Sequence, residues 1–311
     1  MPDGVTVSVV ESSVIEEEGF AALAVVTAEQ VTIAIADGMI FTRPLAIQQI
    51  IDSKNGNYAA ADIHIIIGNG SQAKIMYLQT GEADIFFLNQ RIQLTLGKNT
   101  KVELDTLIDA KDGVHSLQDW QVDLAEQAHL TTRTMLVRGK WTRQNWDISL
   151  IGSGAIVDLA GLYAPTRDKL ADMHLTVRHS APDCRSTQLF RGIIGQQGTG
   201  VWRGAVIVDD TATGTEVQQS DRNILLADTA VMHAQPHMQI HTDDVIASHG
   251  VTSGQLDQQA LLYLRSRGVS AEQAAELLML AHAEEVISRV PYAAWQEHCM
   301  AAIHDTISLQ K

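Results

Sequence analysis

The segment Pro236–Gly268, with the sequence PHMQIHTDDVIASHGVTSGQLDQQALLYLRSRG, decides the predicted fold. Its first part is extended and alternating, its middle is typical of a Ser-His-Gly turn, and its last part has helical spacing and ends at Arg267 and Gly268. Strand and turn patterns dominate the chain before this segment, and helical patterns follow it. We therefore predict a β domain followed by a small helical domain, with this segment joining them.

Three helices are predicted after Ser253. The first places Leu256, Ala260, Leu261 and Leu264 on one face and stops at Gly268. The second begins at Ser270, where Gln273 completes a capping box, and the third begins at Pro291. The buried stripe of the second helix is expected to contain Ala274, Leu277, Leu278, Ala281 and Ile287.

A repeat runs through the β region between about residues 60 and 245. A small residue followed two positions later by an aliphatic one recurs after a turn, at intervals of 27, 28 and 27 residues, in the pairs Ala73/Ile75, Thr100/Val102, Ala128/Leu130 and Ala155/Val157. A near-constant period without helical patterning indicates stacked rungs, as in a β-helix, with small residues at the tight corners. Chance matches in a β-rich chain remain the alternative at this point.

The rest of the β region is less regular. Alternating valine and isoleucine residues predict strands at 5–9 and 31–35, and Pro44–Ser53 is compatible with a short helix. Asp221–Asn223 is typical of a turn. We divide the chain into a mixed N-terminal segment (1–59), a β-helix core (60–252) and a C-terminal helical domain (253–311).

Composition limits the possible functions. The 311 residues carry a formal net charge of −15, which argues against nucleic-acid binding because that requires a dense basic surface. Two cysteines, Cys184 and Cys299, are too few for a disulfide framework and favour a reducing compartment. Neither a signal peptide nor an apolar run of about 20 residues is present, so a cytoplasmic protein without membrane segments is expected.

Three motifs resemble the SufB/SufD family of iron–sulfur cluster assembly proteins: VRHSAPDCRSTQLFRG (177–192), QSDRNILLADTA (219–230) and, above all, HTDDVIASHGVTSGQLDQQALLYLRSRG (241–268). Within the family, SHG followed by GQLDQQALLYLRSRG is similar to SufD-like members. The resemblance extends from about residue 115 to 290. It implies a mainly β fold, with a right-handed parallel β-helix core and a C-terminal α-helical domain, in agreement with the residue patterns.

The resemblance also implies partners. Family members form a SufBCD-type complex, in which a SufB-like and a SufD-like protein pair through the C-terminal part of their β-helices. Each docks a SufC-like ABC ATPase through its C-terminal helices, which here lie between Gln255 and Ser308. The chain contains no phosphate-binding GxxxxGK[ST] loop, so ATP hydrolysis must come from the partner. No enzymatic activity of its own is expected.

His249 is the candidate site residue. In SufD-like proteins the histidine of SHG is implicated in cluster formation at the interface with SufB, and an imidazole can hold iron while thiolates supply sulfur. A histidine that hydrogen-bonds backbone in a turn is the alternative without the resemblance. The resemblance implies that the chain alone binds no cofactor and that a transient iron–sulfur cluster can form at the partner interface.

The chain departs from the family at three positions. SufD-like proteins often have cysteine where this chain has Ala247. The cysteine and glutamate of SufB scaffolds correspond to Leu264 and Ala293 here. The resemblance therefore implies half a cluster site that a partner must complete.

Other histidines and cysteines of the sequence are weaker candidates for a metal or thiol site. His233, His237 and His241 are spaced by four, but Pro236 disfavours a helix, and on a strand only His237 and His241 are expected to share a face, so a metal site is not favoured. Cys184 follows His179 closely, although a buried cysteine is the simpler interpretation, and Cys299 is expected to pack within a helix.

Two alternative functions remain. Asp209–Asp210 and Asp243–Asp244 would suit a polysaccharide-active β-helix enzyme, which uses paired carboxylates. A minimal system, in which the chain forms a homodimer with two ATPase subunits, is the closer alternative.

Overall fold

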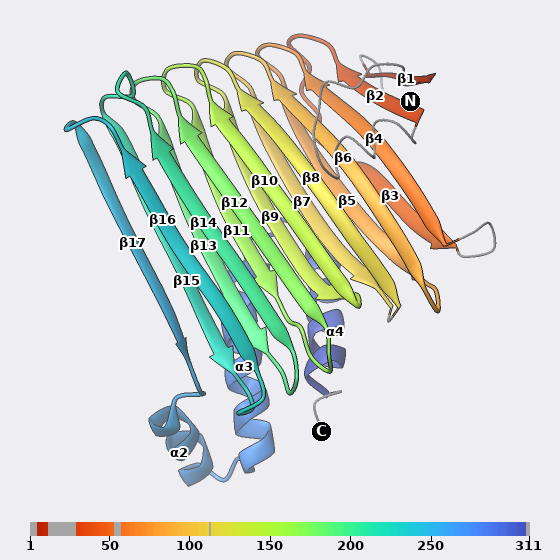
Figure 1. The fold of residues 1–311 in the computed structure, drawn as a ribbon, viewed down its shortest axis with the longest axis vertical. Helices are drawn as coiled ribbons and strands as arrows, with labels where there is room; N and C mark the ends of the chain where they lie inside the picture. The colour runs from red at the N-terminus through yellow and green to blue at the C-terminus, as the bar shows by residue number, and fades with distance from the viewer. Residues whose placement is uncertain (1–4, 12–28, 53–56, 112, 309–311) are drawn as a thin grey trace.

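Two sheets form most of the structure, a computed structural model that describes residues 5–11, 29–52, 57–111 and 113–308 (Figure 1). Sheet A contains, in spatial order, β1 (Val5–Glu11), β2 (Glu29–Ile35), β4 (Tyr58–Ile67), β6 (Phe86–Leu96), β8 (Val114–Leu124), β10 (Trp141–Leu150), β12 (Leu170–His179), β14 (Thr199–Val208) and β16 (Val231–Ile240). Sheet B contains β3 (Leu45–Asp52), β5 (Gln72–Glu82), β7 (Lys101–Ala110), β9 (His129–Arg138), β11 (Ile156–Tyr163), β13 (Arg185–Ile194), β15 (Thr215–Leu225) and β17 (Val245–Gly254).

The chain alternates between the two sheets, so each consecutive pair of strands makes one rung of a solenoid. The sixteen strands from β2 to β17 give eight rungs. Successive strands within each sheet are parallel, and β1 is antiparallel to β2. Inward side chains of the two sheets meet in a continuous apolar core that includes Ile65, Leu94, Val122, Ile148 and Val177. The predicted parallel β-helix with a helical C-terminus is confirmed.

The repeat found in the sequence corresponds to the stacking of rungs. Val102, Leu130 and Val157 lie in register on β7, β9 and β11, as their spacing predicted. The sequence repeat aligned the pair Ala73/Ile75 with the later pairs two residues out of register, because the register partner of Val102 on β5 is Ala73 and not Ile75.

Two segments differ from the prediction. The sequence of Pro44–Ser53 is compatible with a short helix, but Leu45–Asp52 is strand β3, which pairs in parallel with β5. Asp221–Asn223 was expected to be a turn, but it lies within strand β15. Strands β2 and β3 also extend the two sheets ahead of residue 60. The predicted domain boundaries themselves stay a prediction.

The helices α2 (Gln258–Ser266), α3 (Ala271–Ile287) and α4 (Ala293–Ser308) follow β17. Ser270 and Gln273 form the predicted capping box, and Gly268 has the left-handed φ of 89° that ends α2. Helix α4 begins two residues after Pro291. Within the described ranges, the helices are too short or too polar to cross a bilayer.

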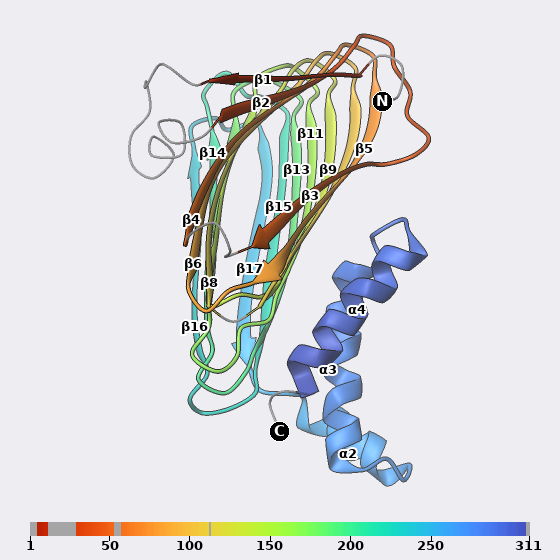
Figure 2. The same ribbon diagram turned by 90° about the vertical axis from the view of Figure 1, so that its right-hand side faces the viewer.

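Helices α3 and α4 cover the outer face of sheet B, and α2 lies beyond its end (Figure 2). A second apolar cluster fills the space between them, with Met135, Leu162 and Ile193 from the sheet and Val286 and Ile303 from the helices. The buried face of α3 consists of Ala274, Met279, Ala283, Val286 and Ile287. Leu277 and Ala281, predicted to be buried, are instead exposed, because the sheet and α4 contact a different face of α3.

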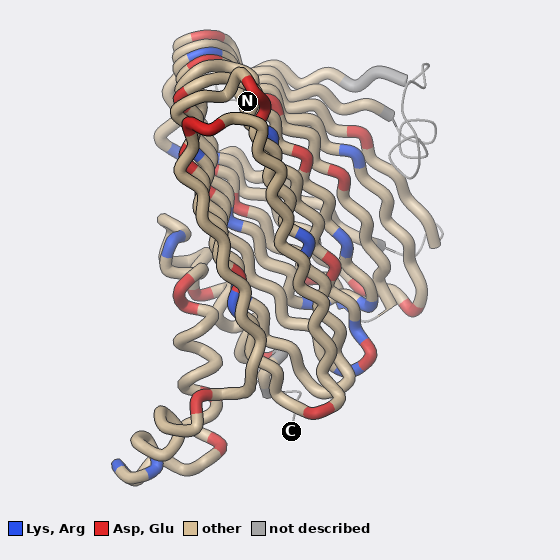
Figure 3. Tube along the Cα trace, turned by 60° about the vertical axis from the view of Figure 1, so that its left-hand side comes forward, with Lys and Arg blue, Asp and Glu red and all other residues tan. Residues whose placement is uncertain are grey.

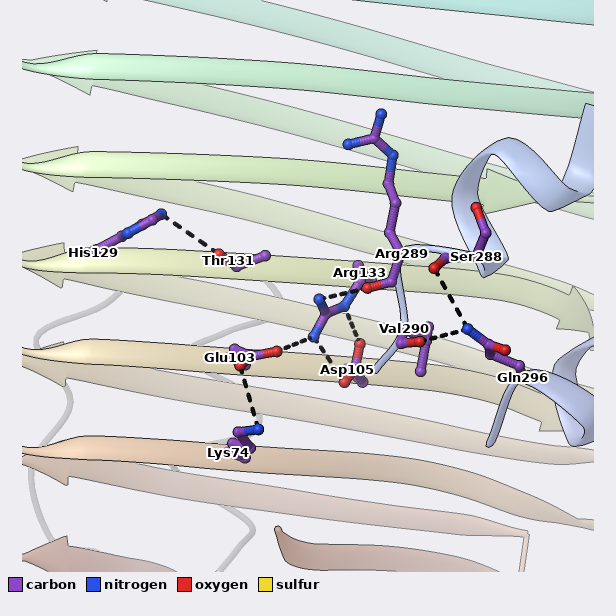
Figure 4. A network of polar contacts seen from close by, with 10 residues as sticks. All are labelled: Lys74, Glu103, Asp105, His129, Thr131, Arg133, Ser288, Arg289, Val290 and Gln296. Carbon is purple, nitrogen blue, oxygen red and sulfur yellow. Dashed lines mark hydrogen bonds and ion pairs between the residues drawn. The ribbon is translucent and has the colours of Figure 1, made fainter. Parts of the chain in front are cut away.

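A buried ionic network fixes the loop between α3 and α4 to sheet B (Figure 4). Arg133 of β9 bonds to Asp105 and Glu103 of β7, and its Nη1 donates to the carbonyl oxygen of Arg289 at 2.8 Å. Asp105 is 1% exposed, and burial raises its pKa against the opposing effect of Arg133. A second link joins Arg191 of β13 to Glu285 of α3 at 2.8 Å. Together these contacts hold the helices in one position on the solenoid.

Candidate functional site at the open end of the solenoid

The last rung of the solenoid leaves two strand edges free. β16 ends sheet A and β17 ends sheet B, so each has a strand neighbour on one side within the described chain. Neither strand contains Lys, Arg, Asp or Glu, and Figure 3 shows this end of the solenoid without charged positions along both strands. Proteins usually protect a free strand edge with charges, proline or a bulge. β16 contains Pro236, but β17 has neither a charge nor a proline, so the free edge of β17 is typical of a surface that a partner covers.

His249 points toward the axis of the solenoid at this open end. β17 continues the register of β15 without a break, and His249 is paired with the inward-facing Gln219. The predicted Ser-His-Gly turn is therefore wrong, because these residues lie in the middle of a strand. His249 is exposed because β17 is the last strand of sheet B in the described part of the chain.

His249 has apolar neighbours on its own strand and a polar residue beneath it on β15. Ala247 and Val251 lie two residues away on the same face of the strand. Beneath His249, Gln219 donates from Nε2 to Gln188 at 2.7 Å, while its buried Oε1 has no hydrogen-bond partner among the described residues. Within that part of the chain, no three His, Cys, Asp or Glu side chains gather as a metal site. His249 alone could supply at most one ligand to a metal ion.

The other histidines lie elsewhere. β16 turns His233 and His237 to the outer face of sheet A, so the expectation that only His237 and His241 share a face is wrong. An i, i+4 pair on a strand is about 13 Å apart, too far for two ligands of one metal ion. Gln239 donates to Nε2 of His241 at 2.7 Å. These residues do not join His249.

Cys184 is a buried corner residue. It occupies the position equivalent to that of the small residue Ala155, one rung further along the solenoid. Its Sγ donates to the carbonyl oxygen of Gly152 at 3.3 Å. His179 bonds to Ser186 instead, at 2.9 Å, and burial lowers its pKa to about 4. Burial also raises the pKa of the Cys184 thiol. The pair therefore lacks the features of an activated thiol.

Cys299 packs in the cluster between the helices and sheet B, as predicted. Burial raises the pKa of its thiol to about 12, assisted by the charges of Asp105 and Asp109. Neither cysteine faces the open end, so the described chain brings no thiol to His249.

Both thiols are expected to react with a disulfide reagent at least about tenfold more slowly in the native protein than in the unfolded chain. The reason is that both thiols are buried and that burial raises both pKa values, which disfavours the reactive thiolate form. Absorbance after addition of the reagent, with and without denaturant, measures this. A fast phase in the native protein would contradict the assignment.

The paired aspartates have structural roles at turns. Asp209 accepts hydrogen bonds from Arg178 at 3.0 Å and Ser180 at 2.8 Å. Asp244 accepts from the backbone N–H of Gly214 at 3.1 Å. These contacts link neighbouring rungs and account for one aspartate of each pair, Asp209 and Asp244.

Comparison with known proteins identifies the family. Residues 49–282 match the family described as SUF system FeS cluster assembly, SufBD core domain. The chain belongs to the SufBD family. The resemblance inferred from the motifs is thereby confirmed, and the open-end histidine lies within the matched core domain.

Individual relatives agree. The chain is 26% identical to the iron-sulfur cluster assembly protein SufD of Escherichia coli over 295 residues, covering 93% of the chain and 70% of that protein. It is 31% identical over 208 residues to a SufBD family protein of Mycobacterium leprae, and 28% identical over 212 residues to one of Synechocystis. These matches cover 64% and 68% of the chain, but 53% and 47% of the relatives, so it spans about half of their length. The chain is thus a SufBD-type iron–sulfur cluster assembly protein close to SufD.

The sequence did not reveal which apolar residues of the helices are exposed. Leu262 and Tyr263 of α2 are 67% and 60% exposed, and Leu277 of α3 is 49% exposed. The helical pattern did indicate an apolar face on α2, but not which residues would remain uncovered. Leu264 and Ala293, where SufB scaffolds have cysteine and glutamate, lie on α2 and α4 rather than on β17.

Proposed function

We propose that this chain is the SufD-like subunit of a SufBCD-type complex that assembles iron–sulfur clusters. Its β16–β17 end pairs with a SufB-like protein, and its C-terminal helices dock a SufC-like ATPase. The observation that carries the proposal is the combination of free, uncharged strand edges with an inward-facing histidine, His249, on one of these strands. Backbone pairing across such edges would extend each sheet into the partner.

His249 is then half of the cluster site. In the proposed complex its imidazole faces the junction between the two solenoids, where a partner can supply thiolate and carboxylate ligands. The chain brings alanine at position 247 and no thiol to this end, which supports the need for a partner. The cluster is cargo that forms at the interface.

Co-expression with the SufB-like and SufC-like proteins of the same organism tests the proposal. We expect the three chains to elute together in size-exclusion chromatography. Elution of the chain as a stable homodimer that binds the ATPase, without a SufB-like protein, would instead favour the minimal homodimeric system. Failure to bind either protein would overturn both.

Leu262→Glu is expected to weaken ATPase binding by roughly tenfold to a hundredfold, because burying a leucine side chain contributes about 1.5–3 kcal/mol. Leu262, Tyr263 and Leu277 are large apolar residues exposed on α2 and α3, and α2 has no buried residue. Titration calorimetry with the purified ATPase measures the change. The matched control is Ile151→Glu, which introduces the same charge at a residue 55% exposed after β10. Equal loss in both variants would argue against docking through α2.

A further inference from the structure

Three polar side chains form a hydrogen-bonded group inside the solenoid, directly beneath the last strand of sheet B, and Asn223 Nδ2 also donates to Ser253 Oγ on that strand at 3.4 Å. The Tyr163 oxygen lies 2.9 Å from Asp221 Oδ1 and 2.6 Å from Asn223 Oδ1, and Asn223 Nδ2 lies 2.7 Å from Asp221 Oδ2. All three side chains are buried, with Asp221 0% exposed. Asp221 and Asn223 are register partners of Val251 and Ser253 on β17.

The register explains how a tyrosine from β11 reaches β15. Gly192 of β13 lies between Tyr163 and Asn223 in the same row. A Cβ at Gly192 would lie 2.2 Å from Asn223 Oδ1 and 2.6 Å from the Tyr163 ring. The missing side chain therefore leaves the passage through which the tyrosine ring crosses the intervening strand.

The three contacts need three protons. Each of the three distances is that of a hydrogen bond, so each contact requires one hydrogen between the two heavy atoms. Tyr163 has one hydroxyl proton. The Asn223 amide meets one neighbour with its nitrogen and the other with its oxygen, so it supplies one proton to the group whichever way the amide is turned. An ionised Asp221 supplies none, and one close contact between oxygen atoms would remain without a hydrogen.

We propose that Asp221 is a proton-binding site of the native protein, where the carboxyl proton completes a ring of hydrogen bonds with Tyr163 and Asn223. In this ring each side chain donates once and accepts once. Loss of the proton leaves a charge and an unmatched oxygen pair in the last enclosed rung. The C-terminal end of the solenoid is therefore most stable when Asp221 is neutral.

Few charges face Asp221. Arg191 lies on the neighbouring strand β13 and is paired with Glu285 of α3. His282, also on α3, bonds to the carbonyl oxygen of Arg222. On β17, His249 lies diagonally across from Asp221. The opposite strands, β14 and β16, turn only non-titratable residues inward: Gly200, Trp202, Gly204, Val206, Val208, Met232, Ala234, Pro236 and Met238. No cation of the described chain makes a direct ion pair with the carboxylate.

The pKa of Asp221 agrees with this geometry. Burial raises it from the usual 3.8 to about 6, although the hydrogen bonds from Asn223 and Tyr163 and the charge of Arg191 oppose the rise. A folded-state pKa above the unfolded value means that the native state binds the proton more tightly. Its contribution to stability is complete below pH 3.8 and is lost as the pH rises to about 6.

Asp221→Asn is the test, because asparagine can donate to Tyr163 and accept from Asn223 as the protonated acid does. Relative to this variant, the folding equilibrium constant of the wild-type protein should fall by up to about tenfold per pH unit between pH 4 and 6, and by about a hundredfold in total. Urea denaturation at a series of pH values measures both proteins. Asp243→Asn, the same change at an exposed residue, should keep the pH dependence of the wild type.

Carbon-13 NMR of the wild-type protein, labelled at its aspartate carboxyl groups, gives a second readout that is measured on the wild-type protein itself, and the variant serves only to assign the signal. One carboxyl signal, absent from the Asp221→Asn spectrum, should titrate near pH 6. Titration of that signal near pH 4, or equal pH dependence of the wild type and Asp221→Asn, would overturn the proposal.

Discussion

Replacing Arg133 with methionine is expected to lower the free energy of unfolding by about 3–5 kcal/mol at pH 7. The change leaves the carboxylate of Asp105 buried without its cation and removes the hydrogen bond to the carbonyl oxygen of Arg289. The loop between α3 and α4 then loses its polar contact with β9. The effect should shrink at low pH, because the raised pKa of Asp105 allows the carboxyl group to become neutral.

Chemical denaturation followed by circular dichroism measures the loss. Arg185→Met is the matched control: Arg185 bonds to Glu216 at 3.0 Å, but its side chain is 54% exposed, and exposed pairs contribute about 0–1 kcal/mol. The double variant Arg133→Met/Asp105→Leu should recover most of the stability, since replacing a buried pair by apolar residues is often neutral. A loss in Arg133→Met no larger than that in Arg185→Met would show that the network does not hold the helices.

The β-solenoid was predictable because its main signal is periodic. Val102, Leu130 and Val157 stack on successive strands of sheet B and are therefore spaced by about 28 residues. Each rung must bury apolar side chains at equivalent positions, so the same pattern repeats in the sequence. The helices were predictable for a different reason, since Ser270 with Gln273 and Gly268 are local capping signals. Local and periodic patterns survive in a single sequence.

The wrong predictions concern residues whose conformation depends on distant partners. Leu45–Asp52 has a spacing compatible with a short helix, and pairing with β5 makes it a strand. Asp221 and Asn223 are typical turn residues. They lie in a strand because Tyr163, about sixty residues earlier, satisfies their polar groups inside the core. The exposed Leu277 depends likewise on which face of α3 meets the sheet.

The candidate site was only partly accessible from patterns. The motif around SHG identified His249 through the family resemblance, while residue preferences alone predicted a turn at this place. Only the register between β15 and β17 places its imidazole toward the solenoid axis. The free edges of β16 and β17 likewise follow from the order of strands in space.

His249→Ala is expected to reduce cluster maturation by the assembled complex by at least about tenfold. Removing a group that only orients a metal ligand already reduces affinity or activity by about tenfold to a hundredfold, and the loss of a ligand itself should not be smaller. Folding should be nearly unchanged, within about 0.5 kcal/mol, because the side chain is exposed at the end of the solenoid. Transfer of a cluster to an acceptor apo-protein, followed by visible absorbance, measures maturation, and co-elution of the subunits verifies that the complex still forms.

His237→Ala is the matched control, since it removes an exposed imidazole from the outer face of β16, the last strand of the opposite sheet, and should leave maturation intact. Ala247→Cys adds a more stringent comparison. It places a thiol on the same face of β17 as His249, two residues and about 7 Å along the strand. A soft ligand beside the imidazole should increase iron retention by the isolated chain, and the increase should vanish in the Ala247→Cys/His249→Ala double variant. If His249→Ala matures clusters as well as His237→Ala does, the inward imidazole is not a cluster ligand, and the open end serves subunit pairing alone.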